Sequence, residues 1–268
     1  MRVRPPAVAG SFYPADPVAL ASAVDRYLAE GRTRLGPPEP RTRPKALIAP
    51  HAGYVYSGPI AGTVYAALQP HVDGVERVVL LGPAHRVAVD GLAASAADAF
   101  ATPLGEVPLD RVAVHDSLRH SQVRIADAAH AREHSLEVQL PFLQRLLGRF
   151  ELIPFAVGAA THAEVAEVLD DLWGGAETLI VISSDLSHYY DYASATQMDA
   201  DTAAAIEALH SERLGPESAC GRIPVGGLLL AAQRHGLHAR LLDLRNSGDT
   251  AGPRDEVVGY GAFALSAL

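Results

Sequence analysis

The chain has 268 residues, of which 49% are hydrophobic, so it is long enough to bury a full core. Its net charge of −9 argues against wholesale nucleic-acid binding, which requires a broad basic face, although it is compatible with local basic patches. No apolar run reaches the ~20 residues that span a bilayer. The single cysteine forms no internal disulfide and the N-terminus lacks the apolar core of a signal peptide, so we expect a cytoplasmic protein that binds neither nucleic acid nor membrane.

The first predicted element is a helix that begins after Asp16 and ends at Gly31. Asp16 is a typical N-cap, Pro17 suits the first turn, and Gly31 is a typical C-terminal stop. Apolar residues recur at every fourth position and predict one buried face: Leu20, Val24 and Leu28. A polar, proline-rich connection over residues 36–44 follows this helix.

From residue 46 onward, short apolar runs alternate with helical patterns. Strands are predicted over residues 46–49, 77–81, 152–157, 179–183, 240–244 and 257–265. Helices are predicted over residues 134–147, 161–173, 198–210 and 224–235. Continuous apolar strands separated by helices indicate a largely parallel sheet covered on both faces. We therefore expect an α/β fold, a single three-layer αβα domain that spans residues 1–268.

Chemically active side chains follow three of these predicted strands. His51 comes directly after the first, His85 after the second, and Asp185 and His188 after the fourth. In open parallel sheets, ligands bind outside the carboxyl ends of the strands, so we expect these side chains to share one edge. Small residues in "PHAGYVYSG" and "GPAHR" permit a close approach of a ligand.

Cys220 precedes the helix predicted to begin near Pro224, and Arg222 stands beside it. A helix N-terminus and a cation both lower the pKa of a thiol, which favours the metal-binding thiolate; the alternative is a small buried hydrophobe. A weaker pattern joins His134 and Glu137, which share a face if their segment is helical. Asp185 is expected either to orient His188 or another imidazole, or to cap a helix.

Two imidazoles and one thiolate, from His51, His85 and Cys220, make a three-ligand metal site with an open position. This is the metal centre that we predict.

An ordered set of motifs resembles the Memo family, called AmmeMemoRadiSam system protein B in prokaryotes. The motifs cover essentially the whole chain: "VAGSFYP", "IAPHAGYVYSG", "LLGPAHR", "TPLGEVPLD", "EHSLEVQLPFL", "IPFAVG", "SSDLSHY", "CGRIPVGGLL" and "GYGAFAL". The resemblance implies a fold like that of class III extradiol dioxygenases, which bind Fe(II) through two histidines and a glutamate. At the matching positions this chain has His51, His85 and Cys220, so a thiolate stands where the carboxylate would be.

The resemblance also implies that His134, Asp185 and His188 surround the metal, with His188 in the position of the dioxygenase acid/base. Family members are associated with iron and copper, and a thiolate ligand favours soft or electron-rich metals. We therefore expect Fe(II) or copper, and zinc less. A small molecule or peptide is the expected ligand of the cleft. An AMMECR-type protein and a radical SAM protein are the expected partners in a shared pathway.

Four functions are consistent with these residues. The first is a metal-dependent oxidoreductase, dioxygenase-like, in which His188 moves protons and His134 hydrogen-bonds the substrate. The second is a non-catalytic module that binds a peptide or small ligand in the same cleft. The third is a metal store or chaperone with the same ligands and no turnover. The fourth is a zinc hydrolase.

Overall fold

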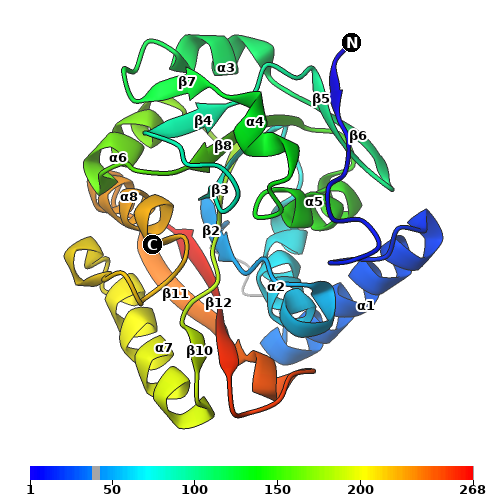
Figure 1. The fold of residues 1–268 in the computed structure, drawn as a ribbon, viewed down its shortest axis with the longest axis vertical. Helices are drawn as coiled ribbons and strands as arrows, with labels where there is room; N and C mark the ends of the chain where they lie inside the picture. Colours follow the sequence, from blue (N-terminus) through cyan, green and yellow to red (C-terminus); the bar gives the residue numbers. More distant parts are fainter. Residues whose placement is uncertain (38–42, 268) are drawn as a thin grey trace.

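The computed structural model describes residues 1–37 and 43–267. Within these ranges, a nine-stranded central sheet has the order β10-β12-β2-β9-β3-β8-β4-β7, and β11 pairs with β12 (Figure 1). Its strands are β2 (Ala46–Ala49), β3 (Arg77–Pro83), β4 (Leu92–Ala94), β7 (Val123–Ile125), β8 (Glu151–Val157), β9 (Thr178–Ser183), β10 (His188–Tyr190), β11 (His238–Asn246) and β12 (Val257–Ser266).

The middle of the sheet consists of four parallel strands in the order β2-β9-β3-β8. Antiparallel pairs flank them, β12 against β2 on one side and β4 against β8 on the other. Because the four central strands run the same way, their carboxyl ends meet at one edge. The segments that follow β2, β3 and β9 carry the histidines singled out above.

Successive strand residues point to opposite faces, and each face has its own hydrophobic cluster. In β2, Leu47 contributes to one cluster and Ile48 to the other; in β3, Val78 and Val79 divide the same way. One face is covered by α1 (Pro17–Leu35), α2 (Tyr54–Leu68) and α5 (Leu140–Leu147), and the other by α6 (His162–Asp171), α7 (Tyr192–Glu207) and α8 (Arg222–Arg234). This arrangement confirms the predicted three-layer αβα fold.

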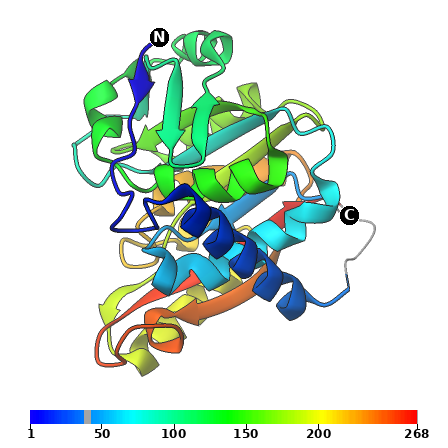
Figure 2. The same ribbon diagram turned by 90° about the vertical axis from the view of Figure 1, so that its right-hand side faces the viewer.

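A second, three-stranded sheet has the order β1-β5-β6, built from β1 (Val3–Arg4), β5 (Ala99–Thr102) and β6 (Gly105–Pro108). Its first strand brings the N-terminal segment past α5, as Figure 2 shows from the side. The short helices α3 (Arg111–Ser117) and α4 (Asp127–Ala131) and the 3-10 turns η1 (Gln69–His71), η2 (Glu137–Gln139), η3 (Ser211–Arg213) and η4 (Ser247–Asp249) complete the described elements.

The six predicted strands are all present, with bounds that differ by at most a few residues. The first helix does not end at Gly31: it continues to Leu35 and is capped at Gly36. Gly31 lies where α1 crosses α2, and a Cβ there would stand 2.4 Å from the carbonyl oxygen of Gly62. Its small size therefore serves close helix packing and not helix termination.

Another helix boundary differs from the prediction. Helix α7 begins at Tyr192 and not at residue 198, because the Asp191 side chain caps it by accepting from the backbone N–H groups of Ala193 and Ser194. Of the predicted connection over residues 36–44, residues 38–42 lie outside the described part of the chain. Within the described ranges, no helix combines the length and apolar character needed to cross a membrane.

Candidate metal centre

His51 is buried just beyond the end of β2, and its ring proton can be located from its neighbours. Nδ1 lies 2.9 Å from Oγ of Ser183, at the end of the neighbouring strand β9. The Ser183 hydroxyl donates to the carbonyl oxygen of Ser135 at 2.5 Å and accepts from the amide of Gln139 at 2.7 Å. Because the Ser183 hydroxyl gives its proton to Ser135, it can only accept from His51. Nδ1 of His51 therefore carries the hydrogen, and Nε2 keeps a lone pair.

His85 follows β3 and is oriented by Glu133. Its Nδ1 lies 2.9 Å from Oε1 of Glu133, and its backbone N–H donates to Oε2 at 2.6 Å. Burial alone would raise the pKa of Glu133, but hydrogen bonds from the His85 ring and from the backbone of Ser135 lower it to about 2. The ionised carboxylate can only accept, so Nδ1 of His85 is protonated and Nε2 is free to bind a metal.

His134 completes a group of three imidazoles. It stacks on His85 with ring centroids 4.8 Å apart, and its centroid lies 5.5 Å from that of His51. One ring nitrogen of each histidine lies within 4.8 Å of the other two, an arrangement that can hold a metal ion. Burial lowers the pKa of His134 to about 4, so its ring is neutral near pH 7. Its buried Nδ1 has no hydrogen-bond partner among the described residues.

Cys220 lies beside this group, just before α8. Its Sγ is 3.3 Å from Nε2 of His51 and accepts the backbone N–H of Asp185 at 3.3 Å. The expectation of a lowered thiol pKa is wrong for the metal-free protein: burial, reinforced by the Asp185 carboxylate, raises it to about 12. Arg222 instead lies near His162, where burial lowers the pKa of the imidazole and the charge of Arg222 adds to that effect.

Asp185 and His188 lie at the same edge of the sheet but do not pair with each other; of the two predicted partners of Asp185, His188 or another imidazole, the structure places it against His51. Asp185 accepts the backbone N–H of His51 at 2.7 Å, and burial raises its pKa to about 7. The orienting contact of His188 comes from the carbonyl oxygen of Leu186, 2.8 Å from Nδ1. A carbonyl only accepts, so Nδ1 is protonated and Nε2 is the basic nitrogen. Burial lowers the pKa of His188, which keeps the ring neutral.

The suggested pairing of His134 with Glu137 is wrong. Glu137 is fully buried and binds Arg4 and the Tyr13 hydroxyl, so its carboxylate is directed toward the N-terminal segment. The carboxylate that serves the site is Glu133, which sequence reasoning missed. Its position directly before His134 was the available signal, but its partner His85 lies 48 residues away in the chain.

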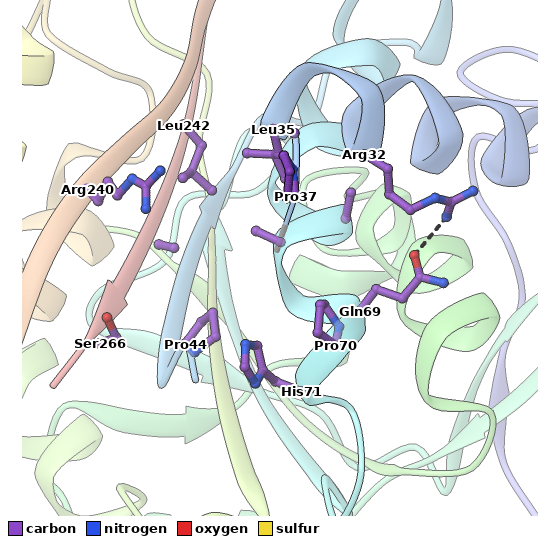
Figure 3. A pocket seen from close by; sticks show the side chains of 14 residues that line it. Arg32, Leu35, Pro37, Pro44, Gln69, Pro70, His71, Arg240, Leu242 and Ser266 are labelled. Carbon is purple, nitrogen blue, oxygen red and sulfur yellow. Dashed lines mark hydrogen bonds between the residues drawn. The ribbon is translucent and has the colours of Figure 1, made fainter. Parts of the chain in front are cut away.

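A separate hollow of about 290 Å³ lies near the start of β2, the opposite end of that strand from His51. Figure 3 shows it between the end of α1, the end of α2 and the strands β11 and β12. Its walls are largely apolar, with Leu35 and Leu242 among the residues that line it, and Arg32 at its rim donates to Gln69 at 2.7 Å. The histidines of the candidate centre do not line this hollow.

Comparisons with known proteins agree in family and fold. A family model described as "Memo-like protein" matches residues 4–264. A MEMO1 family protein from Aquifex aeolicus is 38% identical over 272 residues, covering 97% of this chain and 98% of the relative. A MEMO1 family protein from Ignicoccus hospitalis is 36% identical and covers 98% of each chain. The crystal structure of an uncharacterized Escherichia coli K12 protein superposes with a TM-score of 0.53 at 12% identity, covering 83% of this chain and 100% of that one, which shows a shared fold.

Proposed function

This chain belongs to the family of Memo-like proteins, and we propose that it is a metal-binding protein whose single centre serves redox chemistry with iron or copper. One observation carries the proposal. His51 and His85 both give their Nδ1 hydrogen to a fixed protein acceptor, and both therefore keep an Nε2 lone pair. These nitrogens belong to a group of three imidazoles in which His51 is buried, His134 is half-buried and His85 is exposed. Acceptors behind the ring are the usual companions of metal-binding histidines.

We assign Cys220 as the third ligand. The separation of 3.3 Å between its Sγ and Nε2 of His51 suits two atoms bound to one ion at about 2.0–2.3 Å. A bound ion deprotonates a coordinating thiol, whatever the pKa of the free thiol. Asp185, whose pKa near 7 makes it a proton acceptor at neutral pH, lies beside this ligand pair and would take up the thiol proton. His134 then stands next to the centre as a neutral imidazole.

Iron or copper in such a site supplies one-electron chemistry with an external oxidant, and a thiolate favours the softer or more electron-rich forms of these metals. The chain's own contribution is proton handling. His188 presents Nε2 as a base, because Leu186 holds its Nδ1 hydrogen and burial keeps the ring neutral. We propose that His188 accepts the proton of a bound substrate, as a general base with a pKa below its ordinary value.

Titration of the metal-free protein with Co(II) tests the ligand assignment. We expect one equivalent to bind, with a sulfur-to-cobalt charge-transfer band in the near ultraviolet. His51→Ala and His85→Ala should each weaken binding by more than ~100-fold, beyond the loss typical of an outer partner. Cys220→Ser should remove the sulfur band, whereas His134→Gln should retain it. His71→Ala, which alters a histidine at the distant hollow, is the matched control and should bind as wild type does.

Two outcomes would contradict the proposal. If His51→Ala and His85→Ala bind Co(II) as tightly as wild type, the metal centre is wrong. If Cys220→Ser leaves the spectrum unchanged while His134→Gln abolishes binding, the ligands are the three histidines and the thiolate-based redox assignment fails.

A further inference from the structure

Arg4 is a buried arginine of β1 whose guanidinium binds the loop that carries Glu133 and His134. Nε donates to the carbonyl oxygen of His130 at 3.0 Å, and Nη2 donates to the carbonyl oxygen of Glu133 at 2.6 Å. Nη1 pairs with the carboxylate of Glu137. One planar guanidinium thus binds three acceptors within a segment of eight residues, residues 130–137. It can do so because its donors are fixed in a fork.

The buried ion pair of Arg4 and Glu137 is surrounded by hydrogen bonds from the protein. The side chains are 6% and 0% exposed, so each charge relies on the other and on hydrogen bonds. Glu137 also accepts the backbone N–H groups of Ala7 at 2.7 Å and Val8 at 3.0 Å, and the hydroxyl of Tyr13. The N-terminal segment, residues 4–13, is therefore tied to the loop at residues 130–137.

Both the loop at residues 130–137 and the N-terminal segment contact the candidate metal centre. The Glu133 carboxylate accepts from the ring of His85 and from the backbone N–H of His134, each at 2.9 Å. The ring of Phe12, in the N-terminal segment, packs on His134 with centroids 4.7 Å apart. The carbonyl oxygen of Phe12 accepts the N–H of Tyr54, at the start of the helix that follows His51.

We propose that Arg4 is a positioning residue of the metal centre. By holding the main chain at His130 and Glu133, it sets the carboxylate of Glu133 against His85 and so selects the tautomer in which Nε2 can bind metal. His51 is oriented by Ser183, whose hydroxyl is held by the carbonyl oxygen of Ser135 in this loop and by the amide of Gln139 beyond it. Arg4 therefore acts first on the His85 side of the centre, through Glu133, and the contact with Gln139 keeps Ser183 in place on the His51 side. The inference builds on the proposed function, but its test does not require bound metal.

The test is nitrogen-15 NMR of the histidine rings in metal-free protein, comparing Arg4→Lys with wild type. Lysine keeps the positive charge opposite Glu137 but, as a point donor, cannot span three acceptors. We expect Arg4→Lys to fold, His85 to exchange between both neutral tautomers, and His51 to stay in the Nδ1–H form. Arg2→Lys is the matched control: it changes an exposed arginine two residues earlier in the chain, which pairs with Asp127, and should leave both rings unchanged.

A companion variant and a metal titration complete the experiment. Arg4→Gln, which also removes the charge, should disturb His85 at least as much as Arg4→Lys. Co(II) affinity should fall about tenfold in Arg4→Lys, within the range for outer partners of metal ligands. A folded Arg4→Lys with a wild-type His85 signal would overturn the proposal, and so would equal disturbance of His51 and His85, which would mark a merely structural role. A protein that binds no metal would refute the proposed function and leave the tautomer result standing.

Discussion

Ser183 fixes the tautomer and the orientation of the His51 ring. Its hydroxyl is directed by the carbonyl oxygen of Ser135 and by the amide of Gln139, so it can only accept from Nδ1 of His51. No local pattern predicts this role, because the serine is the last residue of a buried strand and its ring partner lies 132 residues away in the chain. His51 itself was predictable, since it follows an apolar strand at the carboxyl edge of the sheet.

Replacing Ser183 with alanine should weaken Co(II) binding by about 10–100-fold, because Nδ1 of His51 loses its acceptor and the ring is free to change tautomer. The free energy of unfolding of the metal-free protein should fall by about 1–3 kcal/mol, since the buried amide of Gln139 loses a partner. Isothermal titration calorimetry and urea denaturation measure the two effects. Ser22→Ala, at an exposed position of α1, is the control. Unchanged metal affinity in folded Ser183→Ala would show that the serine does not orient the ligand.

The strands of the central sheet were predictable from the sequence, and the ends of the helices were less so. Apolar runs of four to seven residues gave the central strands because each is buried on both faces. Gly31 misled the sequence reasoning, since a glycine near the end of a helical pattern indicates a C-cap as readily as a close helix crossing. Only the approach of α1 to α2, side by side in Figure 2, separates the two readings.

The crossing of α1 and α2 predicts a large effect of Gly31→Ala. The new methyl group would lie 2.4 Å from the carbonyl oxygen of Gly62 and 2.8 Å from Cα of Thr63, both parts of a rigid helix. We expect the free energy of unfolding to fall by about 1–3 kcal/mol or more, the usual result of overpacking. Guanidinium denaturation measures it. Gly215→Ala, where a Cβ meets nothing within 4 Å, should be close to neutral. Equal stability of the two variants would mean that the helices do not cross this closely.

For the whole molecule, buried neutral histidines predict loss of stability in mild acid. Burial lowers the pKa values of His130 and His134 to about 4, below their ordinary value of 6.5. The unfolded chain takes up these protons at about pH 6.5 and the folded protein only near pH 4, so the stabilisation is complete above pH 6.5 and is lost as the pH falls toward 4. At about 1.4 kcal/mol per pKa unit, each histidine contributes up to about 3 kcal/mol.

Urea denaturation at pH 7.5 and pH 5 measures this loss in the metal-free protein. His130→Gln should show a smaller difference between the two pH values than wild type, whatever its stability at pH 7.5. His210→Gln, which alters an exposed histidine, should retain the full difference. A wild-type stability that does not fall between pH 7.5 and pH 5 would contradict the assignment of these rings as neutral.

We propose that this fold holds one redox metal between His51, His85 and Cys220. Metal analysis of protein purified anaerobically from its own host, followed by oxygen uptake with added reductant, tests this proposal. We expect one equivalent of iron or copper per chain, and uptake that is lost in Cys220→Ser and in His51→Ala. Protein that contains neither metal, and shows no uptake after Fe(II) or Cu(I) is added, would contradict the claim.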